Sequence, residues 1–276
     1  MQKLIFDVCG EFGYEILAVA PLVNWYKNNN HEVKVLTSVG SKYLYPECEV
    51  EEVYRQRIPF LQLKINGKIV YNQHHHIGDM WYKPLIGNKM FWEDKWLPPN
   101  IKDHYKVKYK LTLDKPLLII SNKFQSEWSG PPVNYISIEV LKDLFEKLQA
   151  RYTIVYNRPF VEDISNDNST QLPFDDKALC KEFGIAMLQD YMTAYGLDYN
   201  ETQVALYSNT DNFISTQGGN SAYAALFGGT NLIYGIRGNE FKSNAYETWF
   251  KLLSNQEIHT CNSLSELPSM VETVFN

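Results

Sequence analysis

The residues that could do chemistry gather at two glycine-containing turns, and the first turn carries two glutamates. It reads GEFGYEILAVAP (residues 10–21) and follows a short apolar run, where a strand is expected to turn into a helix. A helix N-terminus favours the ionised form of a carboxylate, which can then take a proton from a hydroxyl group. We therefore predict that Glu15 is a general base, with Glu11 and Asp79 as alternative acids. The competing interpretation of Glu15 is a first-turn residue that only complements the helix dipole.

The second turn reads STQGGNSAYAAL (residues 215–226) and again joins an expected strand to an expected helix. The first turn of a helix offers unpaired backbone N–H groups to a phosphate, and glycines let the backbone come close to it. An ordinary turn in which a serine caps the helix is the competing interpretation. The predicted phosphate-binding residues are Ser215, Thr216, Gln217, Gly218, Gly219, Asn220 and Ser221.

Two basic residues follow apolar runs that read as strands. Lys123 comes just after PLLIIS (116–121), and Arg237 follows NLIYG (231–235). Open α/β sheets bind ligands at the carboxyl ends of their strands, so we predict that both cations stabilise a diphosphate. The competing interpretation is a solvated surface charge at each position.

Three consecutive histidines at 74–76 open a segment rich in aromatic residues. Alternate side chains of a strand face opposite ways, so three neighbours cannot bind one ion together, and we predict no metal site. We expect an acceptor-binding loop in which His75, His76 and Trp81 act beside Gly13 and Tyr14 of the first turn. A structural loop with aromatic packing is the competing interpretation.

The overall composition excludes several classes of protein. A net charge of −6 argues against general nucleic-acid binding, which needs a basic surface. The four cysteines are far apart and form no C-x-x-C motif, which is typical of reduced thiols in a cytosol-like compartment. No apolar run approaches the roughly 20 residues that span a bilayer. We therefore expect a soluble, cytoplasmic protein without a transmembrane segment.

Alternating strands and helices must position these turns. A strand, a glycine turn, a helix and a second strand form a βαβ unit, which implies a parallel sheet. We predict an α/β fold with two Rossmann-like domains that face a cleft. The N-terminal, acceptor-side domain covers residues 1–112, and the C-terminal, nucleotide-sugar-binding domain covers 113–276, with a last helix that packs back on the N-terminal domain. The expected strands are 3–8, 32–37, 116–121, 152–156, 212–215 and 231–234, with a hairpin at 61–71, and the expected helices are 14–29, 137–150, 176–195, 220–227 and 263–275.

The first turn resembles that of bacterial lipopolysaccharide heptosyltransferases and, more broadly, of glycosyltransferases with the GT-B architecture. In that family a strand leads through a Gly-Asp turn into a helix with a proline several residues on. Gly13, Glu15 and Pro21 follow this layout, with Tyr14 inserted and glutamate in place of aspartate. Counted back from the proline, Glu15 lies where the family has its acidic residue.

The second turn extends the resemblance to the C-terminal half. The family has a strand, a D-T-G turn, an alanine-rich helix and a strand that ends in glycine. Gly219, the pair Ala224 and Ala225, and Gly235 match this pattern in spacing. The sequence departs from the pattern at three positions, with Gln217 at the family's aspartate, Ala222 at its histidine and Thr230 near its proline.

The resemblance implies an inverting, metal-independent glycosyltransferase that moves a sugar from a nucleotide-diphosphate sugar to a glycan, glycolipid or other hydroxyl acceptor, without a cofactor. No D-x-D motif occurs, which argues against a metal-bound diphosphate. A fucosyl- or sialyl-type transferase and a catalytically silent nucleotide- or glycan-binding protein are the alternatives. A Rossmann oxidoreductase is disfavoured, because the first turn lacks G-x-G-x-x-G.

Overall fold

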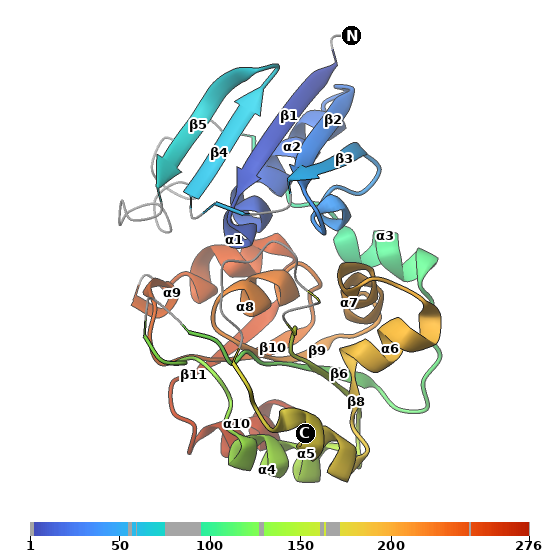
Figure 1. The fold of residues 1–276 in the computed structure, drawn as a ribbon, viewed down its shortest axis with the longest axis vertical. Helices are drawn as coiled ribbons and strands as arrows, with labels where there is room; N and C mark the ends of the chain where they lie inside the picture. Colours follow the sequence, from blue (N-terminus) through green and yellow to red (C-terminus); the bar gives the residue numbers. More distant parts are fainter. Residues whose placement is uncertain are drawn as a thin grey trace. The chain divides into compact units, whose positions relative to one another are not determined.

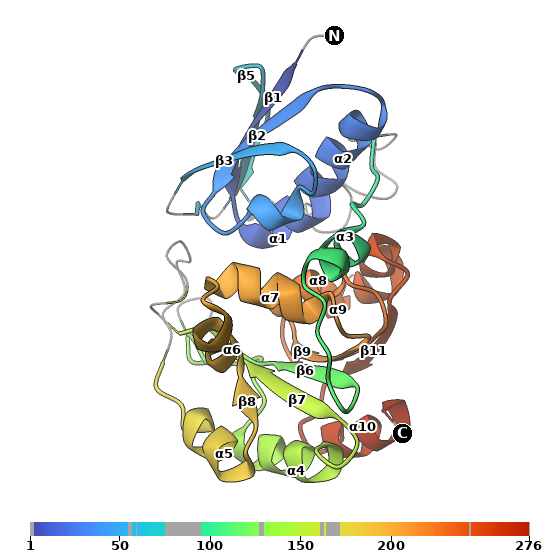
Figure 2. The same ribbon diagram turned by 90° about the vertical axis from the view of Figure 1, so that its right-hand side faces the viewer.

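The strands and helices of the chain form two mixed α/β units, which Figures 1 and 2 show in two views. The computed structural model describes residues 3–54, 57–58, 60–74, 95–126, 130–160, 163, 172–242 and 244–275. Unit 1 consists of the described residues of Met1–Ile101 and Asn239–Ser254. Unit 2 consists of those of Lys102–Ile164, Ser169–Gly238 and Asn255–Asn276.

Unit 1 has a five-stranded sheet in the order β3-β2-β1-β4-β5. Its strands are β1 (Leu4–Gly10), β2 (Val33–Ser38), β3 (Glu49–Tyr54), β4 (Phe60–Ile65) and β5 (Lys68–His74). The first three strands are parallel, whereas β4 and β5 pair antiparallel. The predicted hairpin is confirmed: Asn66 and Gly67 both have positive φ, as a two-residue turn requires. The edge strand β3 was not predicted, because alternating charge hides its period.

The first helix of unit 1 changes its hydrogen-bond pattern near its start. A π-helical turn (Glu15–Val19) lies between α1 (Phe12–Tyr14) and α2 (Ala20–Asn28). Pro21 has no N–H and crowds the carbonyl four residues before it, so the widened turn relieves the clash. The released carbonyl of Leu17 accepts a hydrogen bond of 2.9 Å from the indole nitrogen of Trp96. A segment far along the sequence thus completes the helix.

Unit 2 has six parallel strands in the order β11-β10-β9-β6-β7-β8. They are β6 (Leu117–Ser121), β7 (Thr153–Asn157), β8 (Ala186–Met187), β9 (Asn212–Thr216), β10 (Thr230–Tyr234) and β11 (Glu257–Cys261). From β6, the strands β7 and β8 are added on one side of the sheet. The strands β9, β10 and β11 are then added on the other side of β6. The direction of strand order therefore reverses between β6 and β9.

Helices cover both faces of this sheet (Figure 1). On one face lie α4 (Ile138–Leu148), α5 (Asp176–Phe183) and α10 (Leu267–Val274), and on the other lie α7 (Tyr199–Tyr207) and α8 (Gly219–Ala224). The hydroxyl of Ser137 caps α4 by accepting from the backbone N–H of Val140. Four apolar residues of α4 recur at helical spacing and are fully buried, namely Leu141, Leu144, Phe145 and Leu148.

The predicted helix at 176–195 is two helices. Gly184, with φ of 65°, ends α5 in a left-handed conformation, and the chain then adds the short edge strand β8 before α6 (Leu188–Tyr195). A continuous apolar pattern had concealed this glycine cap. The last helix also differs from expectation, because α10 packs against α4, β10 and β11 within unit 2.

Helix α3 (Ile101–Lys108) begins at the last residue of the first stretch of unit 1, in a segment that had been expected to be a connection. The ammonium of Lys102 donates to the carbonyl of Thr210 at 2.8 Å, and Lys108 forms an ion pair with Glu201 at 3.2 Å. These contacts hold α3 to unit 2, so the units divide earlier than the expected boundary after residue 112. No helix in the described part of the chain is long and apolar enough to cross a membrane.

Candidate functional site

The reversal of strand order in unit 2 brings the ends of β6 and β9 side by side. Ser121 at the end of β6 pairs in register with Ser215 near the end of β9. In open α/β sheets, ligands bind outside the carboxyl ends of the strands at such a switch point. The predicted donor-binding turn follows β9, and the predicted cation Lys123 follows β6, so the fold places both at this position.

The turn after β9 presents backbone rather than side chains. Gly218 has φ of 110° and ψ of −144°, a conformation that residues with a side chain rarely adopt. A Cβ added at Gly219 would meet no atom within 4 Å, so the outer side of the turn is open. Helix α8 has only six residues, and we therefore attribute ligand binding to these backbone groups and to nearby charge rather than to a long helix dipole.

The other residues predicted at this turn have structural partners. Ser215, Thr216, Gln217 and Ser221 are buried, whereas Gly218, Gly219 and Asn220 are at least partly exposed. The hydroxyl of Ser215 donates to Asn231 at 2.9 Å, and that of Ser221 donates to the carbonyl of Gly218 at 2.9 Å. Of the residues predicted at this turn, the two glycines and Asn220 are thus the ones that are accessible at the surface.

The ammonium of Lys123 lies against the same turn. Its nitrogen is 3.4 Å from the position that a Cβ on Gly218 would occupy. A cation, an open glycine backbone and a switch point together suit an anion such as a phosphate.

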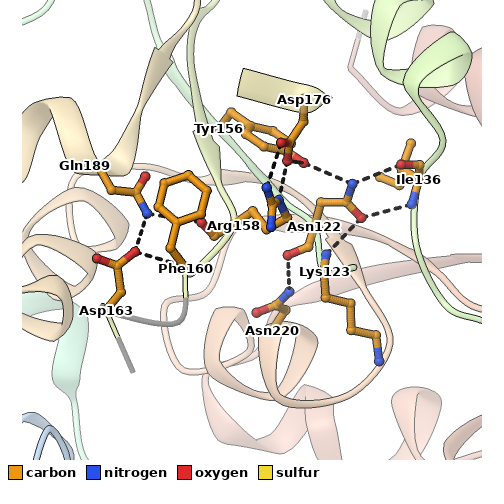
Figure 3. A network of polar contacts seen from close by, with 10 residues as sticks. All are labelled: Asn122, Lys123, Ile136, Tyr156, Arg158, Phe160, Asp163, Asp176, Gln189 and Asn220. Atoms are coloured by element: carbon orange, nitrogen blue, oxygen red, sulfur yellow. Dashed lines mark hydrogen bonds and ion pairs between the residues drawn. The ribbon is translucent and has the colours of Figure 1, made fainter. Parts of the chain in front are cut away.

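Asn122 holds the residues around Lys123 in place (Figure 3). Its side-chain oxygen accepts from the backbone N–H groups of Lys123 and Ile136, both at 2.9 Å. Its side-chain nitrogen donates to the carbonyl of Ile136 at 2.9 Å and to the hydroxyl of Tyr156 at 3.0 Å. Its own carbonyl accepts from Asn220 at 3.1 Å. Asn122 is fully buried, and its side chain and its carbonyl together join the Lys123 backbone, Ile136 and the start of α8.

A buried ion pair continues this network behind the site. The guanidinium of Arg158 donates to both carboxylate oxygens of Asp176, at 2.8 Å for one of them. The hydroxyl of Tyr156 donates to the same carboxylate at 2.7 Å. Burial and the Asp176 charge raise the pKa of Tyr156 well above its ordinary value, so the hydroxyl stays protonated and keeps donating. A buried, fully paired Arg158–Asp176 ion pair thus lies behind Asn122 and Tyr156.

Arg237, the second predicted cation, follows β10, which is the other neighbour of β9. It is exposed, and Asn134 contacts its backbone. The ends of β10, β9 and β6 are adjacent in the sheet, and the residues that follow them are Arg237, Gly218 and Lys123. The fold thus places these three predicted donor residues at neighbouring strand ends.

The first turn, in unit 1, places Glu15 in a buried polar cluster. Its carboxylate accepts from Thr37, from Tyr45 at 2.7 Å, from Ser41 at 2.9 Å and from Arg57 at 2.9 Å. Burial, followed by the Glu15 charge, raises the pKa of Tyr45 well above its ordinary value, so its hydroxyl remains a donor. Glu15 is 1% exposed, and both of its oxygens are engaged. It could take a proton from an acceptor hydroxyl only after these bonds rearranged.

Glu11 differs from Glu15 in its accessibility. It precedes α1 with extended backbone angles, its carbonyl accepts from Tyr14 and Glu15, and its side chain is exposed. Gly13 and Tyr14, which were predicted to contact an acceptor, are buried. Of the acids predicted for proton transfer, Glu11 is thus the one that the described structure places at the surface.

The remaining predicted site residues, Asp79, His75, His76 and Trp81, lie outside the described residues. Within the described ranges, no group of three or more His, Cys, Asp or Glu side chains could hold a metal ion.

Sequence reasoning missed the residues that position the site, which are Arg57, Asn122, Asn134, Arg158 and Asp176. Asn122 could have been predicted from the sequence, since it is a polar residue at the end of an apolar strand, directly before a candidate cation. The others could not, because their partners are distant in the sequence.

Comparisons with known proteins identify the fold. The structure of E. coli ADP-heptose lps heptosyltransferase II is similar, with a TM-score of 0.58 and 10% sequence identity over 99% of this chain and 98% of that one. The wall teichoic acid polymerase TagF aligns with a lower TM-score of 0.39 at 10% identity, over 98% of this chain and 79% of that one. No protein-family model and no curated protein sequence matches the chain. The predicted GT-B architecture is confirmed at the level of the fold.

Proposed function

We propose that the chain is a glycosyltransferase that takes its sugar from a nucleotide-diphosphate donor. The observation that carries this proposal is the Lys123 ammonium beside the Gly218 turn, at the switch point of the unit 2 sheet. The fold, shared with a heptosyltransferase, supports glycosyl transfer as the reaction class. The proposed acceptor is a hydroxyl group of a glycan or glycolipid.

The proposed reaction inverts the sugar and needs no metal. The acceptor hydroxyl loses its proton to a base, its oxygen forms a bond to the anomeric carbon, and the bond from that carbon to the diphosphate oxygen breaks. The nucleoside diphosphate leaves with the bonding electrons, so negative charge develops on it in the transition state. Lys123 and Arg237 would stabilise this charge, which is the part that a divalent ion plays in metal-dependent transferases.

We propose Glu11 as the base, ahead of Glu15. A base must come within hydrogen-bond reach of the acceptor hydroxyl, and the carboxylate of Glu11 is on an exposed residue that an acceptor can approach. Glu15 would first have to leave the hydroxyls of Ser41 and Tyr45 and the guanidinium of Arg57. Asp79, outside the described residues, stays a candidate.

A binding panel tests the proposed donor site. We expect ADP, GDP, UDP or dTDP to raise the melting temperature, since a ligand at 100 times its Kd stabilises by about 2.7 kcal/mol. Lys123→Met should weaken the binding of that nucleotide about 10- to 100-fold, because it removes one charge-assisted contact. Lys181→Met is the matched control, because Lys181 is an exposed lysine on α5, away from the strand ends.

The outcomes of this panel separate the alternatives. If no nucleoside diphosphate binds, or if Lys123→Met binds as tightly as the wild-type protein, the proposed donor site is wrong. If a nucleotide binds through Lys123 but no nucleotide sugar is turned over with any acceptor tested, the silent nucleotide-binding protein is the better description.

A further inference from the structure

Two of the three strand ends at the proposed donor site, those of β10 and β6, are joined by a short segment that precedes α4. This segment is Asn134–Tyr135–Ile136, and we call it the strap. Its first residue contacts the loop after β10, which holds Arg237, and its last residue contacts Asn122, which precedes Lys123. The strap thus connects the loops that carry the two cations on either side of the Gly218 turn.

Asn134 holds the backbone of the Arg237 loop through both the oxygen and the nitrogen of its side-chain amide. Its oxygen accepts from the N–H groups of Ile236 at 2.9 Å and Arg237 at 3.1 Å. Its nitrogen donates to the carbonyl of Arg237 at 2.7 Å. Asn134 is 1% exposed, whereas Ile236 and Arg237 are exposed. An exposed loop is therefore held by a buried side chain, which is the arrangement that pre-orders a binding group.

The other end of the strap is held as firmly. Ile136 both donates to and accepts from the Asn122 side chain, at 2.9 Å in each case (Figure 3). The same side chain accepts from the backbone N–H of Lys123. If one loop moved, the three residues of the strap would have to move with it or the bonds of Asn134 or Asn122 would break. The strap thus links the backbones of the two loops that carry the cations.

We propose that Asn134 is a positioning residue, which holds Arg237 at a defined place relative to Lys123 so that both cations contact one diphosphate. This inference rests on the proposed function, since it assigns the binding partner of the same site. An asparagine suits the role because its amide accepts two N–H groups and donates to a carbonyl without adding a charge that would repel phosphate.

A double-mutant cycle tests whether Asn134 acts through Arg237. Isothermal titration with inorganic pyrophosphate, and with the tightest-binding of ADP, GDP, UDP and dTDP, compares wild type, Asn134→Ala, Arg237→Met and the double variant. We expect Arg237→Met to weaken binding about tenfold, as loss of a charge-assisted contact does. Asn134→Ala should weaken binding about three- to tenfold in the wild-type background and less than twofold in the Arg237→Met background.

A matched control variant separates positioning from general loosening of the fold. Asn209→Ala removes a similar clamp, in which an asparagine accepts from the N–H of Leu111 and donates to the carbonyl of Ala205. Asn209 precedes β9 and so lies near the amino end of that strand, whereas the proposed site lies at the carboxyl ends. We expect Asn209→Ala to lower thermal stability and to leave the Kd of pyrophosphate unchanged.

Hydrogen exchange provides a second measurement if Asn134→Ala does not fold. In the ligand-free wild-type protein, the amides of Ile236 and Arg237 should exchange slowly despite their exposure, because Asn134 holds both. Rapid exchange of both amides would overturn the inference, as would effects of Asn134→Ala and Arg237→Met that simply add.

If wild-type protein binds neither pyrophosphate nor any of the nucleotides, the proposed function fails and the inference fails with it. If binding depends on Lys123 but the effects of Asn134→Ala and Arg237→Met on Kd are additive, the role of Asn134 is wrong and the proposed donor site stands.

Discussion

Replacing Glu15 with glutamine distinguishes a buried anchor from a catalytic base. The carboxylate accepts four hydrogen bonds, and one of its donors is the Arg57 guanidinium, which is 11% exposed. Glutamine is neutral and turns one acceptor oxygen into an NH2 group, which faces donors. Breaking a buried ion pair by removing one partner costs about 3–5 kcal/mol. At about 2–4 °C per kcal/mol, the melting temperature of the variant should fall by about 6–20 °C.

Glu11→Gln is the matched control, because it makes the same chemical change four residues earlier on an exposed side chain. A surface substitution changes stability by about 0.5 kcal/mol or less. If Glu11 is the base, its replacement lowers kcat about 10²- to 10⁴-fold without changing the affinity for the donor. The measurements are calorimetric and urea unfolding of each variant, and kcat with the nucleotide sugar that the binding panel identifies. Unchanged stability of Glu15→Gln together with a collapse of its kcat would refute this reasoning and restore Glu15 as the base.

Three further predictions concern the donor site, the metal and the first helix. Gly219→Ala should leave thermal stability unchanged or raise it slightly, because the new Cβ meets no protein atom. The same substitution should weaken nucleotide binding, and equal affinity would place the phosphates elsewhere. Turnover should persist in excess EDTA, and its loss on chelation with recovery on adding Mg²⁺ or Mn²⁺ would contradict the metal-independent mechanism. Trp96→Phe should cost about 1–3 kcal/mol in urea unfolding, because it leaves the Leu17 carbonyl without its indole donor. An unchanged unfolding midpoint would show that water replaces the indole.

Local patterns in the sequence were sufficient to locate many of the elements and both turns. The predicted strand at 116–121 is β6, the predicted helix at 137–150 is α4, and the Asn66-Gly67 hairpin lies where it was expected. The spacing of apolar residues, the helix-capping residues and the residues of a turn that needs positive φ each involve only a few neighbouring positions. They can therefore be recognised in the sequence without knowledge of the fold. The helix break at Gly184 and the strands β3 and β11 were missed, since neighbouring signals there were ambiguous.

The candidate site could be predicted only as a set of residue types. Lys123, Gly218 and Arg237 were recognised because each follows an expected strand, but their order as neighbours depends on the arrangement β10-β9-β6, which arises when distant strands pair. Topology, rather than any motif, placed the switch point between β6 and β9.

The sequence by itself determined where the chain turns and which residues carry charge at those turns. Only the tertiary structure determined what those charges do. Glu15 and Glu11 are both acids near the start of one helix, yet Glu15 is buried and accepts from Arg57, 42 residues further on, whereas Glu11 is exposed. Asn134 similarly contacts a loop 102 residues away. Burial and pairing depend on contacts between segments that are far apart in the chain, and no local pattern encodes which of those segments meet.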